Sequence, residues 1–166
     1  MLAGPQVGQF FAELGAEVLK IESPAGDITR TWKTTAETAA PEAAKDAPVS
    51  AYFSASNWGK SSLVLDLTTA AGQAGLYRLA ARADIILASY KPGDAEKLRA
   101  DYATLAAGNP RLLYGHLTGY GPTIPAPATM PCCRPKPVSC TSMLLVLASR
   151  PRKCPWPWSI CWPRIS

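Results

Sequence analysis

Hydrophobic and polar positions follow two different periods along the first part of the chain. Across residues 5–15, apolar side chains recur at the spacing of one helix face, with Pro in the first turn and Gly just after the last. The segment "AEVLKIE" then has period two, with Leu19 and Ile21 on one face and Lys20 and Glu22 on the other. The pattern therefore predicts a helix followed by a short strand.

Three more apolar runs alternate with helical segments. "SLVLDL", "ADIILASY" and "RLLYGHLTGYG" are predicted strands, and the second is apolar enough to be covered on both faces. Thr68 or Thr69 is expected to cap the helix after the first of these strands, and Asp94 the helix after the second, which runs through Leu98. A short helix is expected over residues 102–107. Alternating strands and helices predict an α/β fold: a Rossmann-like, mostly parallel sheet with helices on both faces.

A parallel sheet of this kind binds its ligands beyond the carboxyl ends of the strands. The turns after Leu67, Tyr90 and Thr118 are therefore the candidate site. Neither a G-x-G-x-x-G segment after a strand nor a G-x-x-x-x-G-K-[ST] segment is present, so the common nucleotide fingerprints are missing.

Several polar residues have two interpretations each. Asp27 fits an Asx-type turn in "GDITRTW", whereas Arg30 in the same segment fits an anion ligand. Lys60 follows a glycine turn and is either solvated or in contact with a phosphate. His116 is the one histidine of the chain, and its position within a strand favours a structural role over a catalytic one.

Composition changes abruptly after residue 121. Residues 1–121 carry 11 Lys and Arg against 12 Asp and Glu, whereas residues 122–166 carry six Lys and Arg and no acid. The second segment also holds all five cysteines, ten of the 16 prolines and no glycine. We therefore expect a folded region over residues 1–121, and an irregular, disordered tail over residues 122–166.

The same composition argues against several classes of function. The five cysteines show neither C-x₂-C nor C-x₄-C spacing, so no metal is expected; they are Cys132, Cys133, Cys140, Cys154 and Cys161. The basic, Trp-containing tail lacks ordered spacing, so no nucleic-acid partner is expected. "MLLVLA" is too short to span a bilayer, and "MLAGPQVGQFF" lacks the basic start of a signal peptide. These features, with no cysteine before residue 122, predict a cytoplasmic protein without a membrane partner.

Four ordered blocks resemble the opening third of the class III CoA-transferases, a family that includes formyl-CoA transferase, carnitine CoA-transferase and α-methylacyl-CoA racemase. The blocks are "LAGPQVGQFFAELGAEVLKIESPAGDITRTW", "SAYFSASNWGKSSLVLDL", "ADIILASYKPGDAEKL" and "NPRLLYGHLTGYGP". The resemblance implies a Rossmann-like coenzyme A (CoA) domain, interlocked homodimers, and acyl-CoA and carboxylic acid substrates. It also implies covalent catalysis by an aspartate, which attacks the acyl-CoA thioester. The racemases of the family abstract a proton next to the thioester carbonyl instead.

The resemblance also implies CoA contacts, and the sequence departs from formyl-CoA transferase at four positions. That enzyme has Arg where Ser23 stands, Asn-Phe at residues 89–90, and Arg where Lys97 stands; Tyr90 can still stack on adenine, and Lys97 can still pair with phosphate as a point charge. The expected contacts are Leu2, Ala3, Leu65, Asp66, Leu67, Thr68, Ser89, Tyr90, Lys91 and Lys97. The family's strand before "LAGP" is expected to be missing here.

The junction after "GYGP" is where the resemblance stops. A shift of the reading frame makes the first two bases of each codon the last two bases of a new codon, so only the new first base is free. With suitable first bases, "PAPATMPCCRPKPVSCTSM" gives the family-like segment "GPGYDAVLQAETGFMYIN", and "KCPWPWSICWPRIS" gives "MPVALVDLLAAHQ". These two segments suggest a frameshift. The catalytic aspartate of "ALVDLL" would then be encoded across Ser159 and Ile160, so no catalytic residue is expected in this chain. The leading prediction is an inactive N-terminal fragment of a CoA-transferase. The alternatives are a non-catalytic CoA- or nucleotide-binding module, an acyl-CoA racemase of the same family, and a basic interaction protein.

Overall fold

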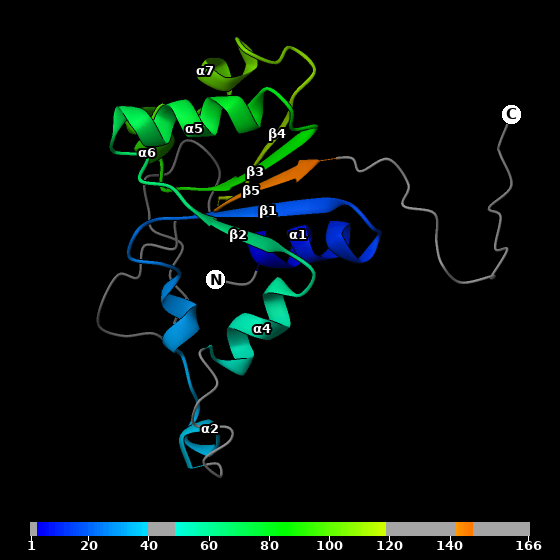
Figure 1. Ribbon diagram of the computed structural model, residues 1–166, viewed down its shortest axis with the longest axis vertical. Helices are drawn as coiled ribbons and strands as arrows, with labels where there is room; N and C mark the ends of the chain where they lie inside the picture. The colour runs from blue at the N-terminus through cyan, green and yellow to red at the C-terminus, as the bar shows by residue number, and fades with distance from the viewer. Residues whose placement is uncertain (1–2, 40–48, 119–141, 148–166) are drawn as a thin grey trace, which may run out of the picture.

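Five strands form a single sheet with the order β2-β1-β5-β3-β4 (Figure 1). The computed structural model describes residues 3–39, 49–118 and 142–147. Four strands run in the same direction, while β5 is antiparallel to both of its neighbours, β1 and β3. The strands are Glu17–Glu22 (β1), Ser61–Val64 (β2), Ile85–Ser89 (β3), Leu113–His116 (β4) and Ser142–Leu147 (β5). The predicted α/β fold with a mostly parallel sheet is confirmed.

Helices cover both faces of this sheet, as expected (Figure 1). Helix α1 (Ala3–Glu13) and helix α4 (Ala51–Asn57) pack together on one face. The other face carries α5 (Ala70–Ala80), α6 (Asp94–Lys97) and α7 (Tyr102–Ala106). The long connection after β1 contains a 3₁₀ turn, η1 (Ile28–Thr31), and a short helix, α2 (Thr35–Ala39). No helix within the described ranges is long and apolar enough to cross a membrane.

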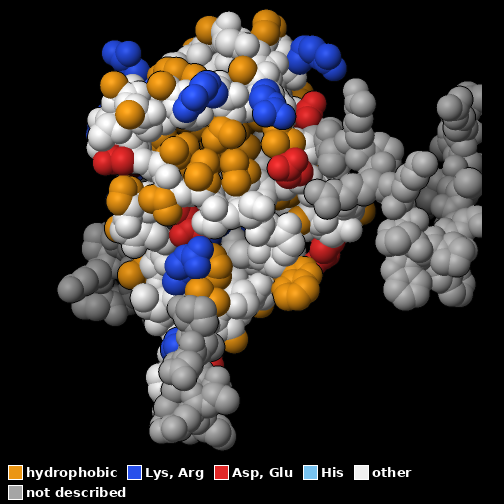
Figure 2. Space-filling view, in the orientation of Figure 1, with side chains coloured by type: hydrophobic (Ala, Val, Ile, Leu, Met, Phe, Trp, Pro, Cys, Tyr) orange, Lys and Arg blue, Asp and Glu red, His pale blue; other side chains and the backbone are white. Residues whose placement is uncertain are grey.

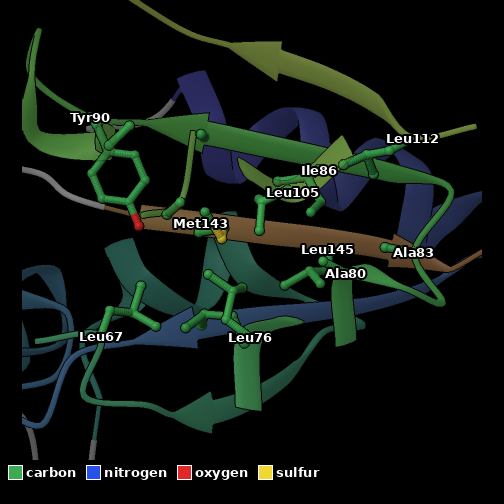
Figure 3. Packing of buried hydrophobic residues seen from close by; sticks show 14 residues of the cluster. Leu67, Leu76, Ala80, Ala83, Ile86, Tyr90, Leu105, Leu112, Met143 and Leu145 are labelled. Atoms are coloured by element: carbon green, nitrogen blue, oxygen red, sulfur yellow. The ribbon is translucent and has the colours of Figure 1, made fainter. Parts of the chain in front are cut away.

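Each face of the sheet has its own hydrophobic cluster. The larger cluster lies under α5, α6 and α7 and includes Leu76, Ile86 and Leu105. Figure 3 shows Met143 and Leu145 of β5 within this cluster, among residues of β3 and α5. The smaller cluster lies under α1 and contains Val18, Leu87, Leu144 and Val146. Strand β5 therefore contributes alternate side chains to both clusters.

Of the two N-cap residues expected from the sequence, one is confirmed and the other is wrong. Thr69 caps α5, since its side chain accepts a hydrogen bond from Gly72 N. The expected Asp94 cap is wrong, because Asp94 is the first helical residue and Gly93 takes the cap position without a side-chain bond. Gly93 has φ 84° and ψ −12°, and Asp94 N donates to Lys91 O. This geometry is a type II turn, which needs glycine at its third position and displaces the cap by one residue.

Strand β5 corrects the expectation of an irregular tail for six residues. Ser142–Leu147 lies in the middle of the sheet, with Lys20 opposite Leu144 on one side and Ile86 opposite Leu145 on the other. Met143, Leu144, Leu145 and Val146 are each no more than 2% exposed. An unbroken apolar run fits a central strand that is covered on both faces, which is why this segment does not stay irregular. The other residues of the range 122–166 lie outside the described part of the chain.

Strand β5 fills the central position of the sheet. In a doubly wound sheet with strand order 3-2-1-4-5, the strand before the first helix lies between the two halves of the sheet. β5 takes this position in the opposite direction. Helix α1 makes room for it at Gly8, where an added Cβ would lie 2.8 Å from Leu144 Cδ1. The C-terminal segment thus joins the β2-β1 pair to the β3-β4 pair.

Edge strand β2 is exposed along its whole length. Leu63 is 37% exposed and Val64 is 57% exposed. Figure 2 shows hydrophobic side chains gathered on this side of the molecule, between α5 and β2. The sheet therefore presents an open apolar edge on the side of β2.

Candidate functional site

A cavity of about 370 Å³ opens at the carboxyl ends of β1, β2 and β3. Its walls come from segments far apart in the sequence: residues 21–23 and 25–28 after β1, residues 65–68 after β2, and Tyr90, Leu98 and Met143. Figure 3 shows Leu67, Tyr90 and Met143 toward the same end of the larger hydrophobic cluster. The cavity lies where ligands bind in open α/β sheets.

The turn after β2 is held by its own side chains. Asp66 Oδ1 accepts hydrogen bonds from Thr68 N at 3.0 Å and from Thr68 Oγ1 at 2.6 Å. These hydrogen bonds hold the pKa of Asp66 below its usual range. Thr69 Oγ1 donates to Asp66 O while it caps α5. The wall formed by residues 65–68 is thus fixed relative to the start of α5.

Gly72 allows this turn to approach the helix. A Cβ added at Gly72 would lie 1.9 Å from Asp66 O, a backbone atom that cannot move without the turn. We expect Gly72→Ala to lower the free energy of unfolding by roughly 3 kcal/mol, as overpacking does. Urea denaturation followed by circular dichroism measures this loss. Gly75→Ala in the same helix is the control, because its Cβ would meet only the end of Leu65 at 3.3 Å, and helix propensity favours alanine. Equal stability of the two variants would contradict the argument.

Tyr90 forms the wall of the cavity at the end of β3. It is 6% exposed, and burial raises the pKa of its hydroxyl to about 12. Its side chain therefore stays neutral at physiological pH. The carbonyl oxygen of Tyr90 lies 3.3 Å from Nε2 of His116.

Two ion pairs, one buried and one half-buried, lie beside the cavity. Lys20 Nζ donates to Asp27 Oδ2, and the two side chains are 2% and 9% exposed. Arg30 holds Glu22 with two hydrogen bonds, from Nε at 3.0 Å and from a terminal nitrogen at 2.8 Å. Glu22 also accepts from Ser62 Oγ at 2.7 Å. Both carboxylates line the cavity with their charges already compensated.

The surroundings keep both carboxylates ionised. Burial by itself raises the pKa of Glu22, but the hydrogen bonds of Arg30 and Ser62 and the charge of Lys20 bring it below its usual range. Asp27 follows the same balance, with Lys20 as its main partner, and its pKa is also lowered. The centroid of the Phe53 ring from α4 lies 4.4 Å from Lys20 Nζ and 4.0 Å from the Arg30 guanidinium carbon, so one aromatic ring contacts both cations.

Comparison with known proteins assigns the family. The model of CoA-transferase family III matches residues 1–133. The chain belongs to this family. It is 41% identical over 127 residues to the succinate–glutarate CoA-transferase of Agrobacterium fabrum and 40% identical over 120 residues to a probable fatty acyl-CoA transferase of Mycobacterium tuberculosis. These matches cover 75% and 72% of this chain but only 31% and 29% of the two relatives, so the chain spans about a third of their length.

Solved structures of the family have the same fold. The crystal structure of the M. tuberculosis protein matches with a TM-score of 0.66 at 39% identity, over 75% of this chain and 32% of that chain. A family member from Brucella suis, described as a CAIB/BAIF family protein, matches with a TM-score of 0.63 at 40% identity and the same coverage. The family assignment therefore rests on both sequence and fold.

The structure brings together half of the expected CoA contacts of this family III chain. Ser89 ends β3 and Lys91 follows Tyr90, but neither lines the cavity. Lys97 lies in α6, where its side chain is 78% exposed and its Nζ is 3.7 Å from Asp94 Oδ1. The residues that do line the cavity are Leu65, Asp66, Leu67, Thr68 and Tyr90. At the N-terminus, Ala3 begins α1 and is exposed, and Leu2 lies outside the described residues.

The observed contacts of Asp27, Arg30 and Lys60 decide between the two interpretations that the sequence left open for these residues. Asp27 forms the Asx-type cap of η1, since its Oδ1 accepts from Thr29 N, and the anion bound by Arg30 is Glu22 of the same chain. Lys60 is neither solvated nor at the cavity: its Nζ donates to Pro5 O, Ser56 O and Asn57 Oδ1. Burial, helped by the charge of Lys20, lowers the pKa of Lys60 to about 8.

The remaining expectations concern His116 and a metal. His116 ends β4 and contacts the Tyr114 ring edge-on, with ring centroids 6.5 Å apart, which fits the structural role. Among the residues that the structure describes, no group of His, Cys, Asp and Glu side chains could hold a metal ion. The five cysteines lie outside that part of the chain.

Proposed function

We propose that this chain is the N-terminal CoA-binding part of a family III CoA-transferase, and that the cavity at residues 21–28, 65–68 and Tyr90 holds the nucleotide end of CoA. The observation that carries the proposal is that two segments with expected CoA contacts, residues 65–68 and Tyr90, line one cavity at the carboxyl ends of the strands. The relatives reported above are named as a succinate–glutarate CoA-transferase and a probable fatty acyl-CoA transferase, which fits a CoA site at this position.

The lining residues supply the contacts that a nucleotide needs. Tyr90 offers a neutral aromatic ring, and Leu67 and Met143 offer apolar walls for a purine. Asp66 is ionised and exposed enough to accept a hydrogen bond from a ribose hydroxyl. Because Lys20 and Arg30 compensate the buried acids, the phosphates meet little repulsion from them. Lys97, on the exposed face of α6, supplies a positive charge for a phosphate.

In the complete reaction, an aspartate carboxylate attacks the acyl-CoA thioester, giving an acyl anhydride and CoA thiolate. The thiolate then attacks the anhydride, which releases the original acid and leaves CoA on the aspartate as a thioester, and the acceptor carboxylate takes CoA from there. Residues 122–166 contain no Asp or Glu, so this chain lacks a carboxylate in the segment after the resemblance. We therefore propose that it binds CoA without turnover. The homodimer, the cytoplasmic location and the frameshift stay predictions from the sequence.

Charge reversal at Lys97 tests the CoA site without touching the core. We expect Lys97→Glu to weaken CoA binding roughly tenfold, because a charge-assisted phosphate contact is replaced by repulsion. Isothermal titration calorimetry of the full chain with CoA measures the effect. Arg111→Glu is the matched control, since Arg111 is exposed and precedes β4 at the amino ends of the strands. Equal affinities of the two variants, or no CoA binding by the unaltered chain, would refute the proposal, and acyl transfer by the purified chain would refute the lack of turnover.

A further inference from the structure

A second cavity, of about 510 Å³, lies on the helical side of the sheet. Helix α5 provides Tyr77 and Ala80, and the region of α7 provides Thr104, Leu105 and Gly108. Arg99, in the turn between α6 and α7, is the single ionised side chain among the residues that line it. The cavity thus combines an apolar body with one cation.

Arg99 has an unusual backbone conformation. Its φ is 52°, and it is the one non-glycine residue with positive φ among those that the structure describes. Arg99 N donates to Glu96 O, and Ala100 N donates to Ala95 O, so the turn closes the end of α6. Glycine is the favoured residue at such a left-handed helix end, because a Cβ is crowded there. A non-glycine residue held in this conformation is a starting point for a functional hypothesis.

The guanidinium of Arg99 takes part in no ion pair with the residues that the structure describes. The residue is exposed. The carboxylate of Asp101, two residues on, accepts hydrogen bonds from Thr104 N and Thr104 Oγ1. The nearest acid in the sequence is thus engaged in capping α7, while Arg99 lines the cavity.

We propose that this cavity binds a small organic anion, with its carboxylate or phosphate on the Arg99 guanidinium and its apolar group against Ala80 and Leu105. Arg presents paired donors that match either anion, and the cavity volume is that of small-ligand sites. Leu98 lines the first cavity and Arg99 the second, so the turn after α6 separates the two sites. The proposal does not rest on CoA binding.

Replacement of Arg99 tests strain and binding together. The full chain is titrated with benzoate and with phenyl phosphate, and amide chemical shifts are followed by NMR, with benzamide as the neutral control. We expect a dissociation constant of about 1 mM for the anions and no comparable binding of benzamide. Arg99→Gly is expected to raise the melting temperature by roughly 4 °C and to weaken anion binding at least tenfold. Arg99→Gln is expected to weaken binding equally without the gain in melting temperature.

Each opposite result overturns the proposal. The first is that about 10 mM benzoate or phenyl phosphate causes no change in the amide chemical shifts of the unaltered chain. The second is that benzamide binds as well as the anions do. The third is that both Arg99 variants bind the anions with unchanged affinity. A loss of thermal stability in Arg99→Gly would likewise contradict the strain that motivates it. Arg111→Gln replaces an exposed arginine that is not among the residues lining this cavity, and this variant is expected to bind the anions as the unaltered chain does. CoA at saturation is expected to leave benzoate bound; displacement by CoA would assign the anion to the first cavity instead.

Discussion

The substitution Leu145→Asp is expected to abolish cooperative folding of the chain. Leu145 is 1% exposed in the central strand β5 and belongs to the larger hydrophobic cluster. A carboxylate at this position has no cation beside it within the cluster, and burying an unpaired charge costs several kcal/mol on top of the lost leucine. That sum rivals the whole stability of a domain, which is about 5–15 kcal/mol. Loss of the urea unfolding transition, measured by circular dichroism and tryptophan fluorescence, is the expected result.

Val64→Asp is the matched control for this experiment. Val64 lies in the same sheet, but at the edge strand β2, and its side chain is 57% exposed. An exposed substitution of this kind changes stability by less than about 1 kcal/mol. Cooperative unfolding of Leu145→Asp with a midpoint close to that of Val64→Asp would show that β5 is dispensable.

The size of the expected effect follows from the sheet topology. β1 and β3 pair with β5 and not with each other, so without β5 the sheet separates into two parallel pairs. Two-stranded units are marginal in water. Leu144 and Leu145 also point to opposite faces and belong to different clusters, so their strand connects the two cores. Residues 142–147 would then determine whether the family-like residues 3–118 fold at all.

The local pattern of apolar and polar residues was sufficient to predict the four parallel strands, but it was not sufficient to predict β5. β1, β2, β3 and β4 were located within a few residues, because each lies in an apolar run bounded by turn residues and alternates with a helix. The run "MLLVLA" was visible too, but a lone apolar run gives no information on its partners. Its pairing with residues 17–21 and 85–89 is non-local and depends on an open position in the sheet.

The residues of the candidate site also divide into those that the sequence could predict and those that depend on tertiary packing. The rule for carboxyl ends of parallel strands pointed to the turns after Leu67 and Tyr90, and the family resemblance added the contacts at residues 65–68 and Tyr90, all of which line the cavity. Leu98 and Met143 reach the cavity only through tertiary packing, and they were missed. The sequence placed Lys20 and Glu22 on one polar face of β1, but it could not show that the chain returns over this face. Phe53 of helix α4 lies over Lys20, and the ion-pair partners Asp27 and Arg30 come from the loop after the strand.

Lys20→Met is expected to lower the free energy of unfolding by roughly 3–5 kcal/mol at pH 7, the usual cost of removing one partner of a buried ion pair. Lys20 is 1% exposed, and its loss leaves the buried Asp27 carboxylate without its cation. The double variant Lys20→Met/Asp27→Asn is expected to recover part of the loss, because an amide keeps the hydrogen bond from Thr29 N without a buried charge. Urea denaturation of the three variants and the unaltered chain completes the double-mutant cycle. Additive losses would mean that Lys20 and Asp27 do not act as a pair.

Measurements at lower pH distinguish this electrostatic explanation from a simple packing defect. In the unaltered chain the pKa of Asp27 lies below its ordinary value of 3.8, so its contribution to stability is present above that pH and is lost as the pH falls further. In Lys20→Met, burial without a cation is expected to raise the pKa of Asp27 above 3.8. Protonation then relieves the buried charge, so the variant gains stability as the pH falls through the raised pKa. The difference in free energy of unfolding between the two proteins should therefore shrink between about pH 7 and pH 3, whereas a packing defect would leave it constant.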